Sequence, residues 1–142
     1  MQHVLVIQSA AEQAPAWQKR CMGSVQKWAT SRGYAYRFLG DELFEQVPDW
    51  YMEKVRGRMP IAADLGRLQW IERLLSEGYS WVLWFDADML VFAPSRLDVA
   101  LGESCIFGKE HWVQAKANNV SHATSIGPVR WVVRKNIHNA FA

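Results

Sequence analysis

Cysteine is scarce in this chain of 142 residues, in which only Cys21 and Cys105 are present. They lie far apart in the sequence, with no Cys-x-x-Cys pattern and no Cys/His metal spacing around them. A fold built on disulfides and a structural zinc site are therefore excluded. Because free cysteine packs as a small apolar side chain, we expect both thiols to be buried.

Long apolar runs and a surplus of one charge sign are also missing. The best candidate for a membrane span, residues 81–92, is interrupted by Asp86 and Asp88 and is shorter than the roughly 20 residues that a spanning helix needs. The apolar run 4–7 is too short for a signal-peptide core. The 16 Lys and Arg residues oppose 14 Asp and Glu residues without forming a basic stripe. These absences predict a cytoplasmic protein with no membrane span and no nucleic-acid partner.

The chain does have enough apolar side chains for a substantial core. Hydrophobic residues make up 50% of it and charged residues 21%, which excludes intrinsically disordered and low-complexity classes. No internal repeat and no linker rich in Gly, Pro or Ser divides the sequence. We therefore expect residues 1–142 to form one domain.

The N-terminal patterns predict a strand, a helix and a second strand. Residues 3–10 form a short, β-branched apolar run, typical of a strand that is buried on both faces. Over 17–32 the apolar residues fall three or four apart, which predicts an amphipathic helix that ends at Gly33. The aromatic-rich run 34–39 follows as a strand. A strand, a helix and a strand in this order predict an α/β fold with a parallel sheet.

The rest of the chain predicts two further helices and two further strands. A helical repeat runs over 60–78 with Pro60 in its first turn, and the bulky apolar run 79–85 after it predicts a buried strand. Residues 41–59 show no sustained period, and we expect a loop with one helical turn there. A short helix over 95–101, capped by Ser95, and a short strand over 104–108 complete the prediction.

The strand over 79–85 ends on two carboxylates, Asp86 and Asp88. Ligands of open parallel sheets bind outside the carboxyl ends of the strands, where the first strand also ends at Gln8, Ser9 and Ala10. Two neighbouring carboxylates repel each other unless a cation offsets them, and Mg²⁺ or Mn²⁺ prefers such oxygens together with substrate phosphates. The pair therefore indicates a metal site for a diphosphate. The alternative is that both residues only end the strand and shape the turn after it.

The segment from Arg67 to Val91 resembles a known family. It contains Gly78-Tyr79-Ser80-Trp81-Val82 and Trp84-Phe85-Asp86-Ala87-Asp88. In these motifs it is similar to the metal-dependent glycosyltransferases of the GT-A fold, particularly their galactosyl- and mannosyltransferase branch. The resemblance implies a Rossmann-like, three-layer α/β/α sandwich around a mainly parallel sheet. It also implies an enzyme that moves a sugar from a nucleotide-diphosphate sugar to a glycan, lipid or protein acceptor.

The same resemblance implies roles for particular residues. Asp88 would coordinate Mn²⁺ or Mg²⁺ on the donor diphosphate, and Asp86, next to Ala87, would face the ribose or the sugar and share the metal. The nucleotide would lie against Gln8, Ser9 and Ala10. Arg67 would approach the donor, although it can also simply pair with Asp64 or Glu72 on its own helix.

Other parts of the site stay open at this stage. Complete members of the family are longer after the motif, so we expect a short or missing acceptor-binding half, an exposed sheet edge and possible self-association. His111, His122 and His138 are candidates for a third metal ligand, and Trp50 and Trp112 for stacking on a sugar or base. No catalytic base is identifiable.

Two alternative functions remain. One is a truncated GT-A domain that binds nucleotide without turnover. The other is a phosphatase of the haloacid-dehalogenase type, with Asp86 as nucleophile, although such enzymes carry this motif on a strand nearer the N-terminus.

Overall fold

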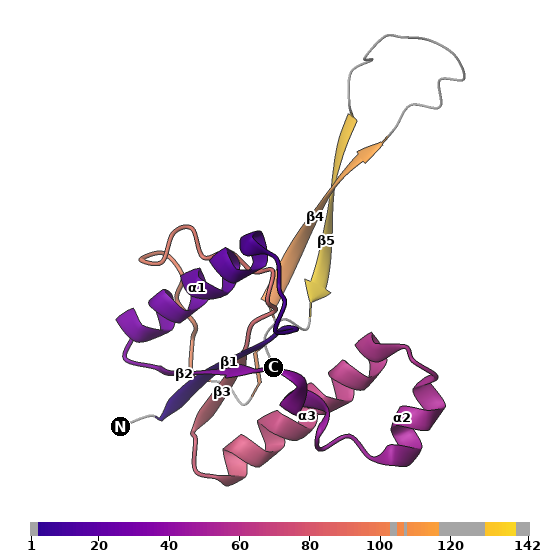
Figure 1. Ribbon diagram of the computed structural model, residues 1–142. Coiled ribbons are helices and arrows are strands. Elements are labelled where there is room, and N and C mark those ends of the chain that lie inside the picture. Colours follow the sequence, from indigo (N-terminus) through magenta and orange to yellow (C-terminus); the bar gives the residue numbers. More distant parts are fainter. Residues whose placement is uncertain (1–2, 103–104, 107, 117–129, 139–142) are drawn as a thin grey trace, which may run out of the picture.

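The structure is a computed structural model that describes residues 3–102, 105–106, 108–116 and 130–138. It confirms an α/β fold in which a parallel sheet lies among helices (Figure 1). Its elements in chain order are β1 (Val4–Ser9), α1 (Ala16–Ser31), β2 (Ala35–Leu39), the 3₁₀ helix η1 (Asp41–Phe44), α2 (Asp49–Val55), α3 (Met59–Ser76), β3 (Trp81–Trp84), β4 (Gly108–Lys116) and β5 (Arg130–His138).

The main sheet has the order β2-β1-β3, and both strand pairs are parallel. Ile7 of β1 lies opposite Arg37 of β2 and Trp84 of β3. The predicted first strand is therefore the central one. All three strands end at the same edge of the sheet, which brings the end of β1 next to Asp86.

Helices cover both faces of this sheet because successive side chains of β1 point in opposite directions. On one face, Val4 and Val6 pack in a buried cluster with Trp28 of α1. On the other, Leu5 and Ile7 pack with residues of α3 such as Trp70 and Leu74. This arrangement explains why residues 4–7 of β1 are all apolar: both faces of the strand are core.

The segment 41–59 is not the predicted loop with one helical turn. It contains η1 and α2, separated by a turn. Leu43, Val47 and Val55 are buried, and Trp70 of α3 donates a hydrogen bond from Nε1 to the backbone oxygen of Glu42 at 3.1 Å. The two helices are thus stabilised by docking against α3. Helices this short show no clear apolar repeat in the sequence, so the pattern did not predict them.

The predicted helix over 95–101 was wrong. These residues form turns and irregular chain, in which the partly buried Leu97, Val99 and Leu101 pack against the α1 side of the core. Partial burial of every second residue does not match a helical period, so tertiary packing outweighs the local signal of Ser95 as a cap. The predicted strand 104–108 lies partly outside the described residues. Cys105 and Ile106 are not in a strand, and β4 begins at Gly108.

The prediction of two buried thiols was also wrong. Cys21 is half-buried and Cys105 is exposed. The buried residues of α1 are Val25, Trp28 and Ala29, all in its second half. Cys21 has the helical spacing for the core face, but it lies on the half of α1 that the sheet covers less.

Beyond the main sheet, β4 and β5 pair as an antiparallel ribbon. Gly108 lies opposite His138, and Lys116 lies opposite Arg130. Figure 1 shows this ribbon extending away from α1 and the parallel sheet. In the described part of the chain, no helix has the length and apolar content that crossing a membrane would require.

A close approach between α3 and η1 generates the first prediction, the effect of Gly66→Ala. A Cβ atom at Gly66 would lie 2.5 Å from the backbone oxygen of Leu43. We expect this variant to lose about 1–3 kcal/mol of unfolding free energy, because the backbone of η1 has to move. Chemical denaturation monitored by circular dichroism measures the change.

The matched control is Gly23→Ala, in the middle of α1, where an added Cβ meets nothing within 4 Å. This variant should keep or gain up to about 1 kcal/mol of stability, since alanine is the better helix former. Equal stabilities of the two variants would contradict a steric requirement at Gly66.

Candidate functional site

A pocket of about 400 Å³ opens at the carboxyl ends of the parallel strands. Its walls come from the end of β1 and the chain after it, from η1 with the preceding Gly40, from the first half of α3, and from the end of β3 with Asp86. The volume lies within the range of ordinary small-molecule sites. Its charged lining residues are Asp41, Asp64, Asp86 and Arg67.

Arg67 is the buried cation of this pocket. Its side chain is only 8% exposed, because α3 turns it inward from the face that packs on the sheet. Nη2 donates a hydrogen bond to Oδ1 of Asp64 at 2.7 Å, one helical turn away. Nη1 lies 3.7 Å from Oδ1 of Asp86, and the guanidinium lies over the Trp84 ring, 5.4 Å from its centroid. Arg67 therefore joins α3 to the end of β3.

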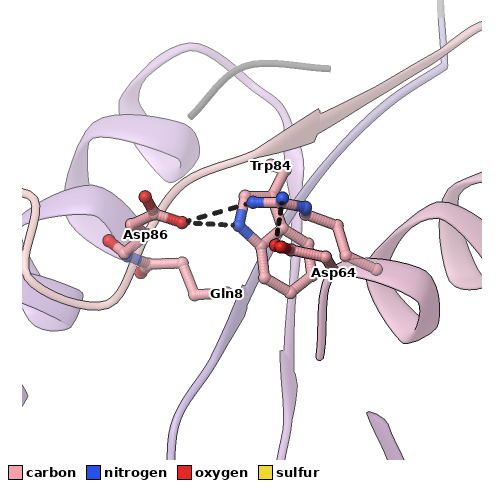
Figure 2. A network of polar contacts seen from close by, with 5 residues as sticks. Gln8, Asp64, Trp84 and Asp86 are labelled. Atoms are coloured by element: carbon pink, nitrogen blue, oxygen red, sulfur yellow. Dashed lines mark hydrogen bonds and ion pairs between the residues drawn. The ribbon is translucent and has the colours of Figure 1, made fainter. Parts of the chain in front are cut away.

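The Asp86 side chain is also held by its own strand. The indole Nε1 of Trp84 donates a hydrogen bond to Oδ1 of Asp86 at 2.9 Å. Figure 2 shows this contact as a dashed line from the Asp86 carboxylate to Trp84. One carboxylate oxygen thus meets both an indole N–H and a guanidinium.

The backbone of Asp86 is fixed from two directions. Its carbonyl oxygen accepts a hydrogen bond from Met89 N at 3.0 Å, which closes a turn over residues 86–89. It also accepts one from Nε2 of Gln8 at 3.1 Å. The position of the motif is therefore set by the end of β1 as well as by β3.

Gln8 is fully buried, and both ends of its amide are used. Its Oε1 accepts a hydrogen bond from the Tyr36 hydroxyl of β2 at 3.1 Å, while its Nε2 reaches Asp86. Burial raises the pKa of the Tyr36 hydroxyl above its ordinary value of 10.0, because the phenolate would lose hydration. A single polar side chain of β1 thus links β2, through Tyr36, to the residue that follows β3, Asp86.

The structure brings together some of the residues that the sequence singled out and separates others. Ser9, Ala10, Arg67 and Asp86 line the pocket. Gln8 and Ala87 are buried and do not line it, and Asp88 is exposed at the turn outside the lining. The Arg67–Asp64 pair was foreseen as a plain helix ion pair, and it forms inside the pocket.

Sequence reasoning missed the contribution of η1 and of Tyr36. Asp41, Leu43 and Phe44 form one wall of the pocket. A signal for the first was present, because Gly40-Asp41 follows β2 and parallel strands end at one edge. The pairing of Tyr36 with Gln8 had no such signal, since it depends on the register between β1 and β2.

Of the remaining predicted ligands, only Trp50 has a described side chain. The side chains of His111, His138 and Trp112, and the whole of His122, lie outside the described residues. Trp50 on α2 is 58% exposed, with Lys54 and Tyr51 against its ring, and is not among the lining residues.

Within the described residues, no group of three or more His, Cys, Asp or Glu side chains could hold a metal ion. The two carboxylates at the turn fit a different mode. Mg²⁺ commonly takes one or two protein carboxylates and completes its shell with water and substrate phosphates. The donor set at Asp86 and Asp88 is compatible with that mode.

Comparisons of the chain with protein-family models, with curated protein sequences and with solved structures find no significant match.

The buried bridge generates a prediction for Gln8→Leu. The leucine leaves the Asp86 carbonyl and the Tyr36 hydroxyl without their buried partner, and we expect a loss of about 1–3 kcal/mol of unfolding free energy. Tyr36→Phe is the control, because it removes one hydroxyl and leaves the Gln8–Asp86 bond; its loss should be about 1 kcal/mol. Urea denaturation of both variants makes the comparison, and a greater loss in Tyr36→Phe would contradict the bridge.

The raised pKa of Tyr36 predicts a loss of stability in alkali. Above pH 10 the Tyr36 hydroxyl ionises in the unfolded chain and resists ionisation in the folded one, so rising pH favours unfolding. The fall in unfolding free energy between pH 9 and pH 11 should be smaller in Tyr36→Phe than in the unaltered protein. Identical pH dependences in urea denaturation would show that Tyr36 is not responsible.

Proposed function

We propose that this chain is the nucleotide-sugar-binding part of a metal-dependent glycosyltransferase, built on the three-layer GT-A sandwich. The observation that carries the proposal is the position of the Asp86-Ala87-Asp88 turn. The turn follows β3 of the main sheet and adjoins a pocket that Arg67, Ser9 and Ala10 line. This is the edge at which open parallel sheets bind nucleotides.

The charge of the pocket supports a requirement for a cation. The lining carries the carboxylates of Asp41, Asp64 and Asp86 against one guanidinium, Arg67. An anionic diphosphate would meet net repulsion there. A divalent cation at the turn would reverse the sign of that interaction, because it attracts both the carboxylates and the phosphates.

Each residue then has a definite task. Asp86 and Asp88 would hold Mn²⁺ or Mg²⁺, which stabilises the charge that develops on a nucleoside diphosphate as it leaves the sugar. Arg67 supplies a second positive charge from the opposite wall. Trp84 and Gln8 hold Asp86 in place before any ligand arrives, so little reorganisation is left for the reaction.

The phosphatase alternative is less well supported by the place of the motif. Enzymes of that type carry it on a strand nearer the N-terminus, whereas here the motif follows β3, the third strand along the chain.

Ligand-dependent thermal stability tests the proposal, with Asp88→Asn as the decisive variant. The melting temperature is measured with UDP, GDP and CDP and their sugars, each with and without Mn²⁺. We expect a rise with one nucleotide series only when metal is present, since a ligand that binds the folded state stabilises it. The rise should be lost in Asp88→Asn, whose turn has one carboxylate fewer.

Asp98→Asn is the control, because Asp98 is another exposed carboxylate whose partner is Arg32, at 3.6 Å. It should retain the full shift. No shift with any nucleotide, or an equal shift in Asp88→Asn, would contradict the proposed donor site. A shift without donor hydrolysis or transfer would indicate a domain that binds nucleotide and does not turn it over.

A further inference from the structure

Arg67 is held unequally by its two acidic neighbours. Its contact with Asp64 is a hydrogen bond of 2.7 Å, whereas its contact with Asp86 is an ion pair of 3.7 Å, beyond hydrogen-bond distance. Asp64 therefore orients the guanidinium, and Asp86 receives mainly its charge. The hydrogen bond on that same Asp86 oxygen comes from Trp84 instead.

This arrangement makes Arg67 the counter-ion of Asp86 in the ligand-free pocket. A second cation at Asp86 would lie near the guanidinium, so Arg67 and that cation oppose each other's binding. The repulsion between Arg67 and this cation is smaller when Arg67 has another acidic partner. Asp64 is that partner, and its side chain is 65% exposed, so it can follow the guanidinium away from Asp86.

We infer that Asp64 is a positioning residue, which draws Arg67 toward itself and so lowers the opposition of Arg67 to a divalent cation at Asp86. Arg67, drawn toward Asp64, then presents its charge to the anionic part of a ligand in the same pocket. Asp64 acts through Arg67 and needs no contact with the cation. The inference rests on the proposed function, because it concerns the same cation site.

Binding of Mn²⁺ alone tests the inference without any measurement of activity. The intensity of the electron paramagnetic resonance signal of free Mn²⁺ falls as the ion binds, so a titration gives the dissociation constant of each variant. Arg67→Gln removes the competing charge, and we expect Mn²⁺ to bind about fivefold tighter or more. Asp64→Asn releases Arg67 onto Asp86, and we expect Mn²⁺ to bind about fivefold weaker or more.

Asp41→Asn is the matched control, because Asp41 lines the same pocket from η1 and its substitution removes the same charge. The double variant Asp64→Asn/Arg67→Gln separates the two explanations of the Asp64 effect. If Asp64 acts through Arg67, its substitution in the Arg67→Gln background should weaken Mn²⁺ binding no more than Asp41→Asn does there. An undiminished Asp64 effect in that background would overturn the inference.

Failure of the inference and failure of the proposed function give different results. If the unaltered protein binds Mn²⁺ but Asp64→Asn and Asp41→Asn have equal dissociation constants, the positioning role is wrong and the cation site stands. If the unaltered protein binds no Mn²⁺, alone or with a nucleoside diphosphate, the cation site itself is wrong, and the inference with it. Asp64 is exposed, so its comparison with Asp41 decides the question even if Arg67→Gln does not fold.

Discussion

The bridge made by Gln8 is the interaction on which the rest of the site depends. Its amide joins the Tyr36 hydroxyl of β2 to the carbonyl of Asp86, at the end of β3, from a fully buried position on β1. An unpaired amide at this depth would cost several kcal/mol, on the order of what a small domain can spare. The three strands must therefore keep their register in the folded state, and this register fixes the start of the turn that carries Asp86 and Asp88.

The walls of the pocket follow from packing rather than from the turn itself. The backbone of α3 can approach η1 closely only because Gly66 has no side chain, and this contact holds Leu43 and Phe44 at the pocket. On the next residue along α3, Arg67 then points into the space between η1 and β3. The close contact of α3 with η1 at Gly66 thus also determines where Arg67 lies in the pocket.

The sequence predicted those elements whose packing requires a regular pattern of apolar residues. β1 and β3 are apolar runs because both their faces are covered, and α1 and α3 show helical spacing because each covers one face. η1 and α2 are short helices stabilised by a neighbour, and the irregular chain around Leu97 and Val99 is held by the core that it packs against. Such segments take their structure from distant residues, so their own pattern was ambiguous or misleading.

The candidate site likewise has local features, which the sequence predicts, and features that depend on distant residues. The Asp86-Ala87-Asp88 motif and the spacing of Asp64 and Arg67 are local, and both were visible in the sequence. The distinction between the two carboxylates of the motif was not, because it depends on contacts from other elements. Trp84, Gln8 and Arg67 all converge on Asp86, whereas Asp88 is exposed on the far side of the turn.

This asymmetry explains how the pocket can be preorganised and still respond to a ligand. The backbone of Asp86 is held by two hydrogen bonds and its side chain by an indole, so neither has to move far. Arg67 is the exception, because its link to Asp86 is a charge contact longer than a hydrogen bond. Any adjustment to an incoming charge therefore falls first on a side chain between two acids, at little cost to the fold that carries it.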